Sequence, residues 1–119
     1  MKIKHFEINN KSKVFIIAEL SANHNGDLNT AIETIKAAKR AGADCIKLQT
    51  YTSDTMTIDS DKDDFVIKGT IWNNQNLYNL YEEAYTPWEW HEPIFNKCRS
   101  ITLMTNFSIT NFDTLPGSM

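Results

Sequence analysis

Three polar side chains of complementary types occur at the ends of two apolar segments. Glu19 follows the apolar residues 14–18, and Lys47 and Gln49 alternate with apolar residues in the segment 44–50. A carboxylate, an ammonium group and an amide that meet in one place can bind a charged ligand and stabilise charge that develops on it. Whether they meet depends on the secondary structure that carries them.

The segment before Glu19 has the pattern of a buried strand. Residues 14–18 have the sequence VFIIA, a continuous run of apolar, mostly β-branched and aromatic residues that is typical of a parallel strand covered on both faces. Asn25 and Gly26 then predict a turn. Glu19 is therefore expected where a strand ends and a polar turn begins.

The following segment carries the signals of an amphipathic helix. Asp27 can accept hydrogen bonds from the unpaired N–H groups of a first helical turn, and Gly42 can adopt the left-handed conformation that ends a helix. Apolar residues recur between them at spacings of three and four and form one stripe: Leu28, Ala31, Ile32, Ile35 and Ala38.

A second strand is predicted over residues 44–50. Alternation separates its side chains into two faces, with Cys45, Lys47 and Gln49 on one and Ile46, Leu48 and Thr50 on the other. Residues 14–50 have the length of a βαβ unit with parallel strands, from which open α/β sheets and (β/α)8 barrels are built.

In either architecture ligands bind at the C-terminal ends of the strands, so Glu19, Lys47 and Gln49 are predicted to lie at one rim. The strand pattern alone equally allows a simpler arrangement. Lys47 and Gln49 would then face solvent from an exposed strand, and Glu19 would merely start a loop.

The segment 51–76 is a long polar and acidic stretch, and loops of that length are usually functional or mobile. Three of its aspartates alternate as in a calcium-binding loop: Asp59, Asp61 and Asp63. Asp64 and Thr70 stand where that motif requires a glycine and a carboxylate, so the sequence favours a solvated acidic face.

Helical spacing returns after this stretch, at Leu77, Leu80, Tyr81 and Ala84, and predicts a short helix. Residues 86–89, TPWE, match a capping box with a proline in the first turn, and Pro93 is expected to bend or interrupt the helix that follows. His91 is interpreted as a surface or capping histidine. Three aromatic residues are expected to pack in the core and rim: Trp88, Trp90 and Phe95.

Composition narrows the function classes. The net charge of −3 and the scattered lysines and arginines predict no nucleic-acid partner. No apolar stretch approaches the ~18 residues of a membrane span, and the N-terminus lacks a signal-peptide core, so a cytoplasmic protein with no membrane partner is expected. Cys45 and Cys98 lack metal-ligand spacing and are expected to be buried free thiols.

The segment 15–52, FIIAELSANHNGDLNTAIETIKAAKRAGADCIKLQTYT, resembles the sialic acid synthase family. An A-E strand end, an N-H-N-G turn, an A-G-A-D junction and a K-x-Q-T strand follow in that family's order. Within that family, the resemblance is strongest to the pseudaminic acid synthase branch, on the residues 18–26, AELSANHNG, and 85–93, YTPWEWHEP. The resemblance implies a (β/α)8 TIM barrel with its active site at the top rim, followed by a small antifreeze-like domain.

The reaction that the resemblance implies is condensation of phosphoenolpyruvate with an amino-sugar aldehyde, 2,4-diacetamido-2,4,6-trideoxy-altrose, to form pseudaminic acid and release phosphate. The alternatives within the family are N-acetylneuraminate and legionaminate synthases. The resemblance also implies a divalent metal, manganese or magnesium, whose ligands lie outside this chain. A homodimer and a role in carbohydrate biosynthesis, as in flagellin glycosylation, are further implications.

Residue roles are carried over from the same resemblance. Glu19 would be the catalytic carboxylate near the metal and the reacting carbons, Lys47 would bind phosphoenolpyruvate, and Gln49 would contact the sugar. Further substrate contacts are expected at Asn74, Ser108 and Thr110. The rim turn would be shaped by Asn23, His24, Asn25 and Gly26, with His24 structural rather than a metal ligand.

A (β/α)8 barrel needs about 250 residues, and the chain has 119. We therefore expect an α/β fold that is the N-terminal portion of a barrel, truncated after two or three strands. Residues 1–119 would form one incomplete barrel domain, family-like over 14–98 and atypical over 99–119. Two alternatives are a catalytically inactive remnant and an independent flavodoxin-like binding module, although a glycine cluster that would cradle phosphate is missing after the first strand.

Overall fold

The computed structural model describes the backbone of residues 1–109 and the side chains of residues 1–105. Its centre is a sheet of three parallel strands in the order β3 (Ile17–Glu19), β4 (Cys45–Thr50) and β5 (Met104–Ile109). Helix α1 (Leu28–Arg40) connects β3 to β4, and α4 (His91–Ser100) precedes β5. The predicted strand, helix and strand are therefore present, and the strands are parallel as expected.

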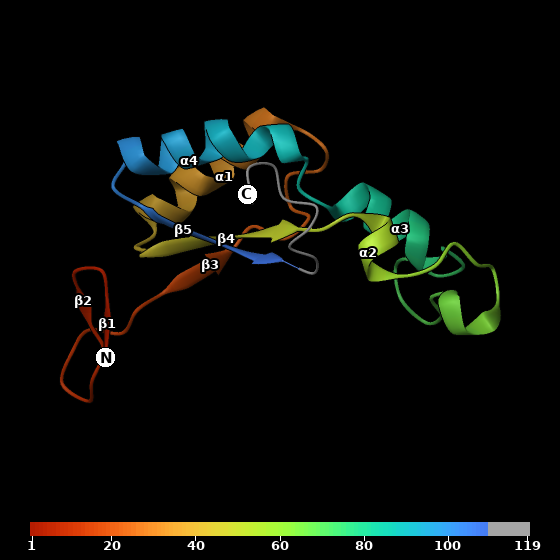
Figure 1. Ribbon diagram of the computed structural model, residues 1–119, viewed down its shortest axis with the longest axis horizontal. Helices are drawn as coiled ribbons and strands as arrows, with labels where there is room; N and C mark the ends of the chain where they lie inside the picture. Colours follow the sequence, from red (N-terminus) through yellow and green to blue (C-terminus); the bar gives the residue numbers. More distant parts are fainter. Residues whose placement is uncertain (110–119) are drawn as a thin grey trace.

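Both helices cover the same face of the sheet, on which α1 and α4 lie side by side (Figure 1). Consecutive strands are also neighbours, with no reversal of order. Doubly wound sheets such as the flavodoxin-like fold reverse their strand order and carry helices on both faces. The arrangement is that of part of a (β/α)8 barrel, which confirms the predicted fold class over the flavodoxin-like alternative.

The core lies between these helices and β4. Ile46 and Leu48 point from β4 into a buried cluster with Ile35 of α1 and Ile94 of α4. The same cluster includes Leu20, Ala31, Cys98 and Leu103. The predicted alternation along β4 is confirmed, because the residues on either side of Lys47 are the ones that the helices bury.

The ends of α1 are where local sequence signals place them. The side chain of Asp27 accepts hydrogen bonds from the N–H of Asn29 at 3.0 Å and from the N–H of Thr30 at 3.3 Å. These bonds satisfy groups of the first turn that have no partner within the helix. Gly42 has a φ of +101°, the left-handed region that favours glycine where a helix stops. The predicted cap and stop are both confirmed.

The prediction for the first strand is partly wrong. The strand spans Ile17–Glu19 rather than residues 14–18, and the run is not covered on both faces. Val14, Ile16 and Ile17 are 75%, 46% and 47% exposed. The physical reason is that β3 is an edge strand within the described residues, and α1 and α4 cover only one face of the sheet.

A hairpin of two short antiparallel strands, β1 (Lys2–Ile3) and β2 (Phe6–Glu7), precedes the sheet. It lies at the end of the sheet where β3 begins (Figure 1). Phe6 packs edge-on against Phe15 with ring centroids 4.9 Å apart. The hairpin was not predicted, because two-residue strands are too short to show alternation.

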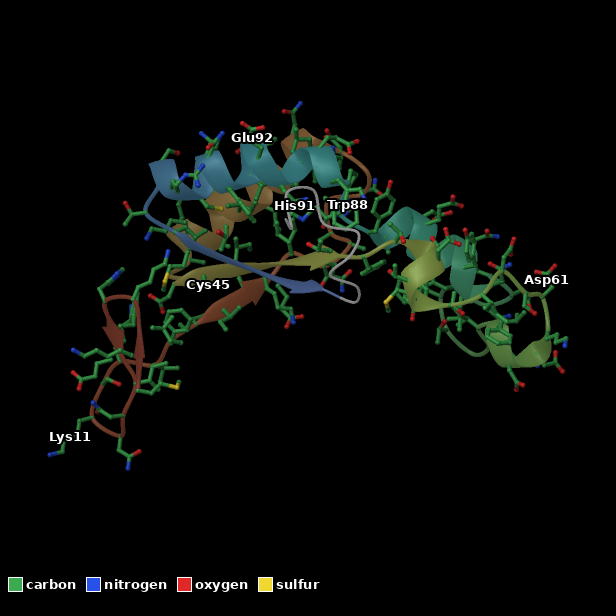
Figure 2. The ribbon with its side chains drawn as sticks, in the orientation of Figure 1. Lys11, Cys45, Asp61, Trp88, His91 and Glu92 are labelled. Atoms are coloured by element: carbon green, nitrogen blue, oxygen red, sulfur yellow. The ribbon has the colours of Figure 1, made fainter. Side chains whose placement is uncertain are left out.

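A long extension over residues 51–90 connects β4 to α4. It contains α2 (Ser53–Met56), the 3₁₀ turns η1 (Asp63–Phe65) and η2 (Trp88–Trp90), and α3 (Leu77–Ala84). The extension projects beyond the end of β4, and Asp61 lies at its far end (Figures 1 and 2). The predicted helix is confirmed as α3, whose N-terminus is capped by Asn76.

The predicted capping box at residues 86–89 is wrong. Pro87 has a ψ of 139°, so helical geometry begins only at Trp88, and none of the described side chains caps η2. The N–H of Thr86 instead donates to the carbonyl of Gln49 at 3.0 Å, which draws Thr86 toward the strand. Pro93 does not interrupt α4, because it lies in the first turn, where the missing N–H has no partner to lose.

Candidate functional site

Glu19, the last residue of β3, and Lys47, in the middle of β4, form an ion pair across two adjacent strands. The parallel register places them opposite each other, and Nζ of Lys47 lies 2.6 Å from Oε1 of Glu19. The Glu19 side chain is 56% exposed and that of Lys47 is 31% exposed. Both side chains therefore lie on the face of the sheet away from α1 and α4, as the strand alternation predicts, and both remain accessible to a ligand.

Gln49 lies two residues further along β4, on the same face as Lys47. Its carbonyl oxygen Oε1 accepts a hydrogen bond from the hydroxyl of Tyr51 at 3.4 Å, and its backbone carbonyl accepts one from Thr86. Within the described residues, Nε2 of Gln49 has no partner. The amide thus offers N–H groups to a ligand beside the ammonium group of Lys47.

The turn between β3 and α1 is closed by the residues predicted to shape it. The Asn23 side chain donates to the carbonyl of Leu20 at 2.9 Å, and the N–H of Gly26 donates to Nδ1 of His24 at 3.0 Å. Asn25 and Gly26 have φ values of +50° and +70°. A left-handed pair favours asparagine and glycine, so this sequence suits the tight turn.

His24 is buried within this turn, with 1% of its surface exposed, and packs edge-on against Trp90 at a centroid distance of 5.1 Å. Because Nδ1 accepts a hydrogen bond, the neutral ring carries its proton on Nε2. Within the described residues Nε2 makes no hydrogen bond of normal geometry. Burial lowers the pKa of His24, and the nearby backbone of Ala84 opposes this more weakly, so the ring is neutral at pH 7.

A cavity of about 570 Å³ lies between the rim turn and α3, and its lining includes His24, Trp72 and Glu83. Glu19, Lys47 and Gln49 do not line it. These three side chains instead share the sheet face that lines the interior of a closed barrel, where catalytic groups gather at the strand ends. We therefore place the candidate site on the sheet face and not in the cavity.

The other expected substrate contacts lie elsewhere or outside the described side chains. Asn74 is exposed, and its N–H donates to the carbonyl of Ile67. That part of the extension lies away from the strands in Figure 1, so the structure does not bring Asn74 beside Lys47. Ser108 pairs in backbone register with Gln49, but its side chain lies outside the described part. Thr110 lies outside the described residues.

Residues 34–117 match the sequence profile of the NeuB family, which is most of the chain. The chain belongs to the NeuB family. The resemblance to the sialic acid synthases is thereby confirmed.

Relatives in the NeuB family match over long stretches. The pseudaminic acid synthase of Campylobacter jejuni subsp. jejuni serotype O:2 is 58% identical over 100 residues, which are 84% of this chain and 29% of that protein. The pseudaminic acid synthase of Helicobacter pylori is 54% identical over 88 residues, 74% of this chain and 26% of that protein. The chain thus spans less than a third of the length of these relatives.

The spatial arrangement has a solved counterpart. The crystal structure of the spore coat polysaccharide biosynthesis protein SpsE from Bacillus subtilis matches with a TM-score of 0.64 and 28% sequence identity. The match covers 92% of this chain and 27% of SpsE. Because 92% of this chain is covered, the match includes most of the extension as well as the sheet. SpsE therefore shares the long connection between β4 and α4.

A second histidine, His91, links β4 to α4. Its Nδ1 lies 3.2 Å from the carbonyl of Pro87 and 3.1 Å from that of Trp88, so Nδ1 carries the proton. Its Nε2 then accepts a hydrogen bond from the hydroxyl of Thr50 at 2.7 Å. Figure 2 shows His91 between α4 and the end of β4. Neither this link nor the one from Tyr51 to Gln49 was predicted from the sequence, although Tyr51 continues the alternation of Lys47 and Gln49.

Both cysteines are buried free thiols, as predicted. Burial raises the pKa of Cys98 to about 11 and also raises that of Cys45. Trp90 and Phe95 pack against the core as expected, and Trp88 stacks on His91.

Among the residues that the structure describes, no three His, Cys, Asp or Glu side chains cluster so that they could hold a metal ion. Asp59, Asp61 and Asp63 of the extension therefore form no such cluster with other described side chains. None of the helices in the described part is long and apolar enough to span a membrane.

Proposed function

We propose that this chain is part of a pseudaminic acid synthase, which condenses phosphoenolpyruvate with 2,4-diacetamido-2,4,6-trideoxy-altrose. The observation that carries the proposal is the ion pair of Glu19 and Lys47. It lies on the sheet face that would line a barrel and at the C-terminal end of β3, where barrel enzymes place their active sites. The similarity to two proteins named pseudaminic acid synthase supports this sugar over the acceptors of other NeuB-family branches.

In the proposed reaction, the methylene carbon of phosphoenolpyruvate forms a bond to the aldehyde carbon of the sugar, and the aldehyde oxygen takes a proton. The second carbon of phosphoenolpyruvate becomes electron-poor and is attacked by water. The bond between that carbon and the phosphate oxygen then breaks, a ketone forms, and inorganic phosphate leaves. Of the two protons that the water loses, one balances the proton taken by the aldehyde oxygen and the other goes to the phosphate. The reaction therefore needs a group that holds a trianion, a group that stabilises developing positive charge, and a group that positions the sugar.

Lys47 and Glu19 suit the first two needs. The ammonium group of Lys47 would anchor the phosphate or carboxylate of phosphoenolpyruvate, and the adjacent carboxylate of Glu19 would orient the water and stabilise the electron-poor carbon. An ion pair between exposed side chains contributes at most about 1 kcal/mol. Lys47 can therefore turn from Glu19 toward an anionic ligand at little cost.

Gln49 suits the third need, because its amide lies beside Lys47 and its Nε2 has no partner among the described residues. A divalent cation, manganese or magnesium, would polarise the aldehyde in the complete enzyme. Its ligands would come from segments other than the residues described, which hold no suitable cluster. The homodimer, the cytoplasmic location and the link to flagellin glycosylation stay predictions.

The proposal is tested with the complete enzyme that contains this chain. Phosphoenolpyruvate, a divalent cation and the 2,4-diacetamido sugar are supplied, phosphate release is measured, and the nine-carbon product is identified by mass spectrometry. Turnover of that sugar supports the proposal. Turnover of N-acetylmannosamine or of the legionaminate precursor in its place would assign the chain to another branch of the family.

The 119-residue chain is assayed alongside it. The inactive-remnant alternative predicts no turnover by this chain alone and poor solubility, because an open parallel sheet leaves an unpaired edge and exposed apolar side chains. Val14, Ile16 and Ile17 are examples of such exposed apolar side chains. A soluble chain with cooperative melting would count against that alternative.

A further inference from the structure

We propose that Tyr51 is a positioning residue that orients the amide of Gln49, so that Gln49 recognises an oxygen acceptor on the amino sugar. The inference rests on the proposed function and adds to it a residue and a direction of hydrogen bonding. It starts from the bond between the Tyr51 hydroxyl and Oε1 of Gln49, 3.4 Å long. That bond is long for two oxygen atoms, and such contacts often tighten when substrate binds.

The hydroxyl of Tyr51 sets which end of the amide faces the site. Tyr51 is 7% exposed, so its hydroxyl needs a partner within the protein. Oε1 of Gln49 is the acceptor that it has in the described part of the chain. With the amide reversed, the phenol hydrogen would lose this acceptor. The hydrogen bond therefore directs Nε2 of Gln49 away from Tyr51 and toward the site, where Nε2 can donate two N–H groups.

The ring of Tyr51 is itself held in place. It packs edge-on against Tyr81 of α3 with ring centroids 5.6 Å apart. On the strand, the backbone carbonyl of Gln49 accepts the N–H of Thr86 at 3.0 Å. Both ends of the extension thus contact Gln49, one through its side chain and one through its backbone. Gln49 is consequently held more firmly than a glutamine on an open sheet face.

An amide held in this direction selects a chemical class of ligand. Two N–H donors match the carbonyl oxygen of an acetamido group or the oxygen of a sugar hydroxyl. The shared requirement is an acceptor oxygen on the sugar. A donor mispositioned by loss of the Tyr51 bond would weaken sugar binding and leave the anchoring of phosphoenolpyruvate by Lys47 unchanged.

The test is steady-state kinetics of the complete enzyme, with each substrate varied in turn. Tyr51→Phe keeps the ring against Tyr81 and removes only the hydroxyl. We expect it to raise KM for the sugar about fivefold, since a neutral hydrogen bond contributes about 1 kcal/mol, with KM for phosphoenolpyruvate unchanged. The matched control is Tyr78→Phe, which removes a hydroxyl that donates to Asp54 at 2.9 Å elsewhere in the extension. It should leave both values unchanged.

Two further variants separate positioning from a structural role. In a Gln49→Ala background, Tyr51→Phe should have no additional effect, because its influence passes through the amide. Gln49→Glu keeps an acceptor for the Tyr51 hydroxyl but removes both N–H donors, so it should impair sugar binding as Gln49→Ala does. Wild-type sugar binding by Gln49→Glu would overturn the assigned direction of the bond.

The remaining outcomes distinguish this inference from the proposed function. An active enzyme in which Tyr51→Phe behaves like Tyr78→Phe, or raises both KM values equally in either background, would overturn the positioning role and leave the synthase assignment intact. A wild-type enzyme that turns over no amino sugar with phosphoenolpyruvate would overturn both.

Discussion

Replacing Lys47 by methionine should separate the stability of the fold from binding of phosphoenolpyruvate. Methionine keeps most of the apolar length and removes the charge. The lost ion pair with Glu19 joins side chains that are 31% and 56% exposed, so the free energy of unfolding should fall by about 1 kcal/mol or less.

The expected loss of binding is larger. Two unit charges about 4 Å apart near a protein surface attract by about 4 kcal/mol at an effective dielectric constant near 20. The exposure of Lys47 and screening by salt reduce this to about 2–3 kcal/mol. At about 1.4 kcal/mol per factor of ten, kcat/KM for phosphoenolpyruvate should fall roughly a hundredfold.

The assay is phosphate release by the complete enzyme at saturating sugar, together with the apparent melting temperature. Lys36→Met is the matched control, because Lys36 has a similar exposure of 34% and lies 2.6 Å from the carboxylate of Glu33 on the surface of α1. It should retain wild-type kinetics. The anchoring role would be refuted if kcat/KM for phosphoenolpyruvate fell less than about threefold in Lys47→Met, or fell no further than in the control.

Three further predictions concern the rest of the fold. Ile35→Ala should lower the free energy of unfolding, measured by denaturant titration, by about 2–5 kcal/mol, because Ile35 is fully buried. The control Ile58→Ala, at a site 62% exposed, should have almost no effect in the same titration. With its pKa raised to about 11 by burial, Cys98 should react with iodoacetamide at pH 8 far more slowly in the native protein than in urea, and equal rates would contradict this. Burial lowers the pKa of His24 below the value of 6.5 that the imidazole has in the unfolded chain. As the pH falls, the unfolded chain is therefore protonated at His24 before the folded protein is, so the melting temperature should be highest above pH 6.5 and fall below it. The profile should be flatter in His24→Asn, and parallel profiles would exclude His24 as the cause.

Helix α1, strand β4 and the proximity of Glu19 to Lys47 could be predicted because their signals are local or follow from simple geometry. The cap by Asp27 and the left-handed Gly42 act within one turn of the helix. Parallel pairing of consecutive strands then brings Glu19, at the end of β3, beside Lys47 of β4 without any knowledge of the loops.

Features that depend on the path of the chain could not be predicted in this way. Residues 86–89 have the composition of a capping box, but the N–H of Thr86 bonds to Gln49, which is 37 residues earlier in the sequence. The link from His91 to Thr50 depends on the same return of the extension to β4. The exposure of Val14 depends on which faces the other elements cover, and apolar character alone does not indicate that.

The extension is bonded to the strand at the residue that we propose contacts the sugar. Most connections between a barrel strand and its helix have about 2–6 residues, whereas residues 51–90 form one with its own helices. Tyr51 and Thr86 attach its two ends to Gln49, and Lys47 instead contacts Glu19 on β3. A change in the extension should therefore displace Gln49 more than Lys47. Replacing residues 53–85 by those of a relative with another acceptor should change the ratio of kcat/KM for the two sugars and leave KM for phosphoenolpyruvate within about twofold. Equal losses for both substrates would show that the extension supports the whole site and does not act through Gln49.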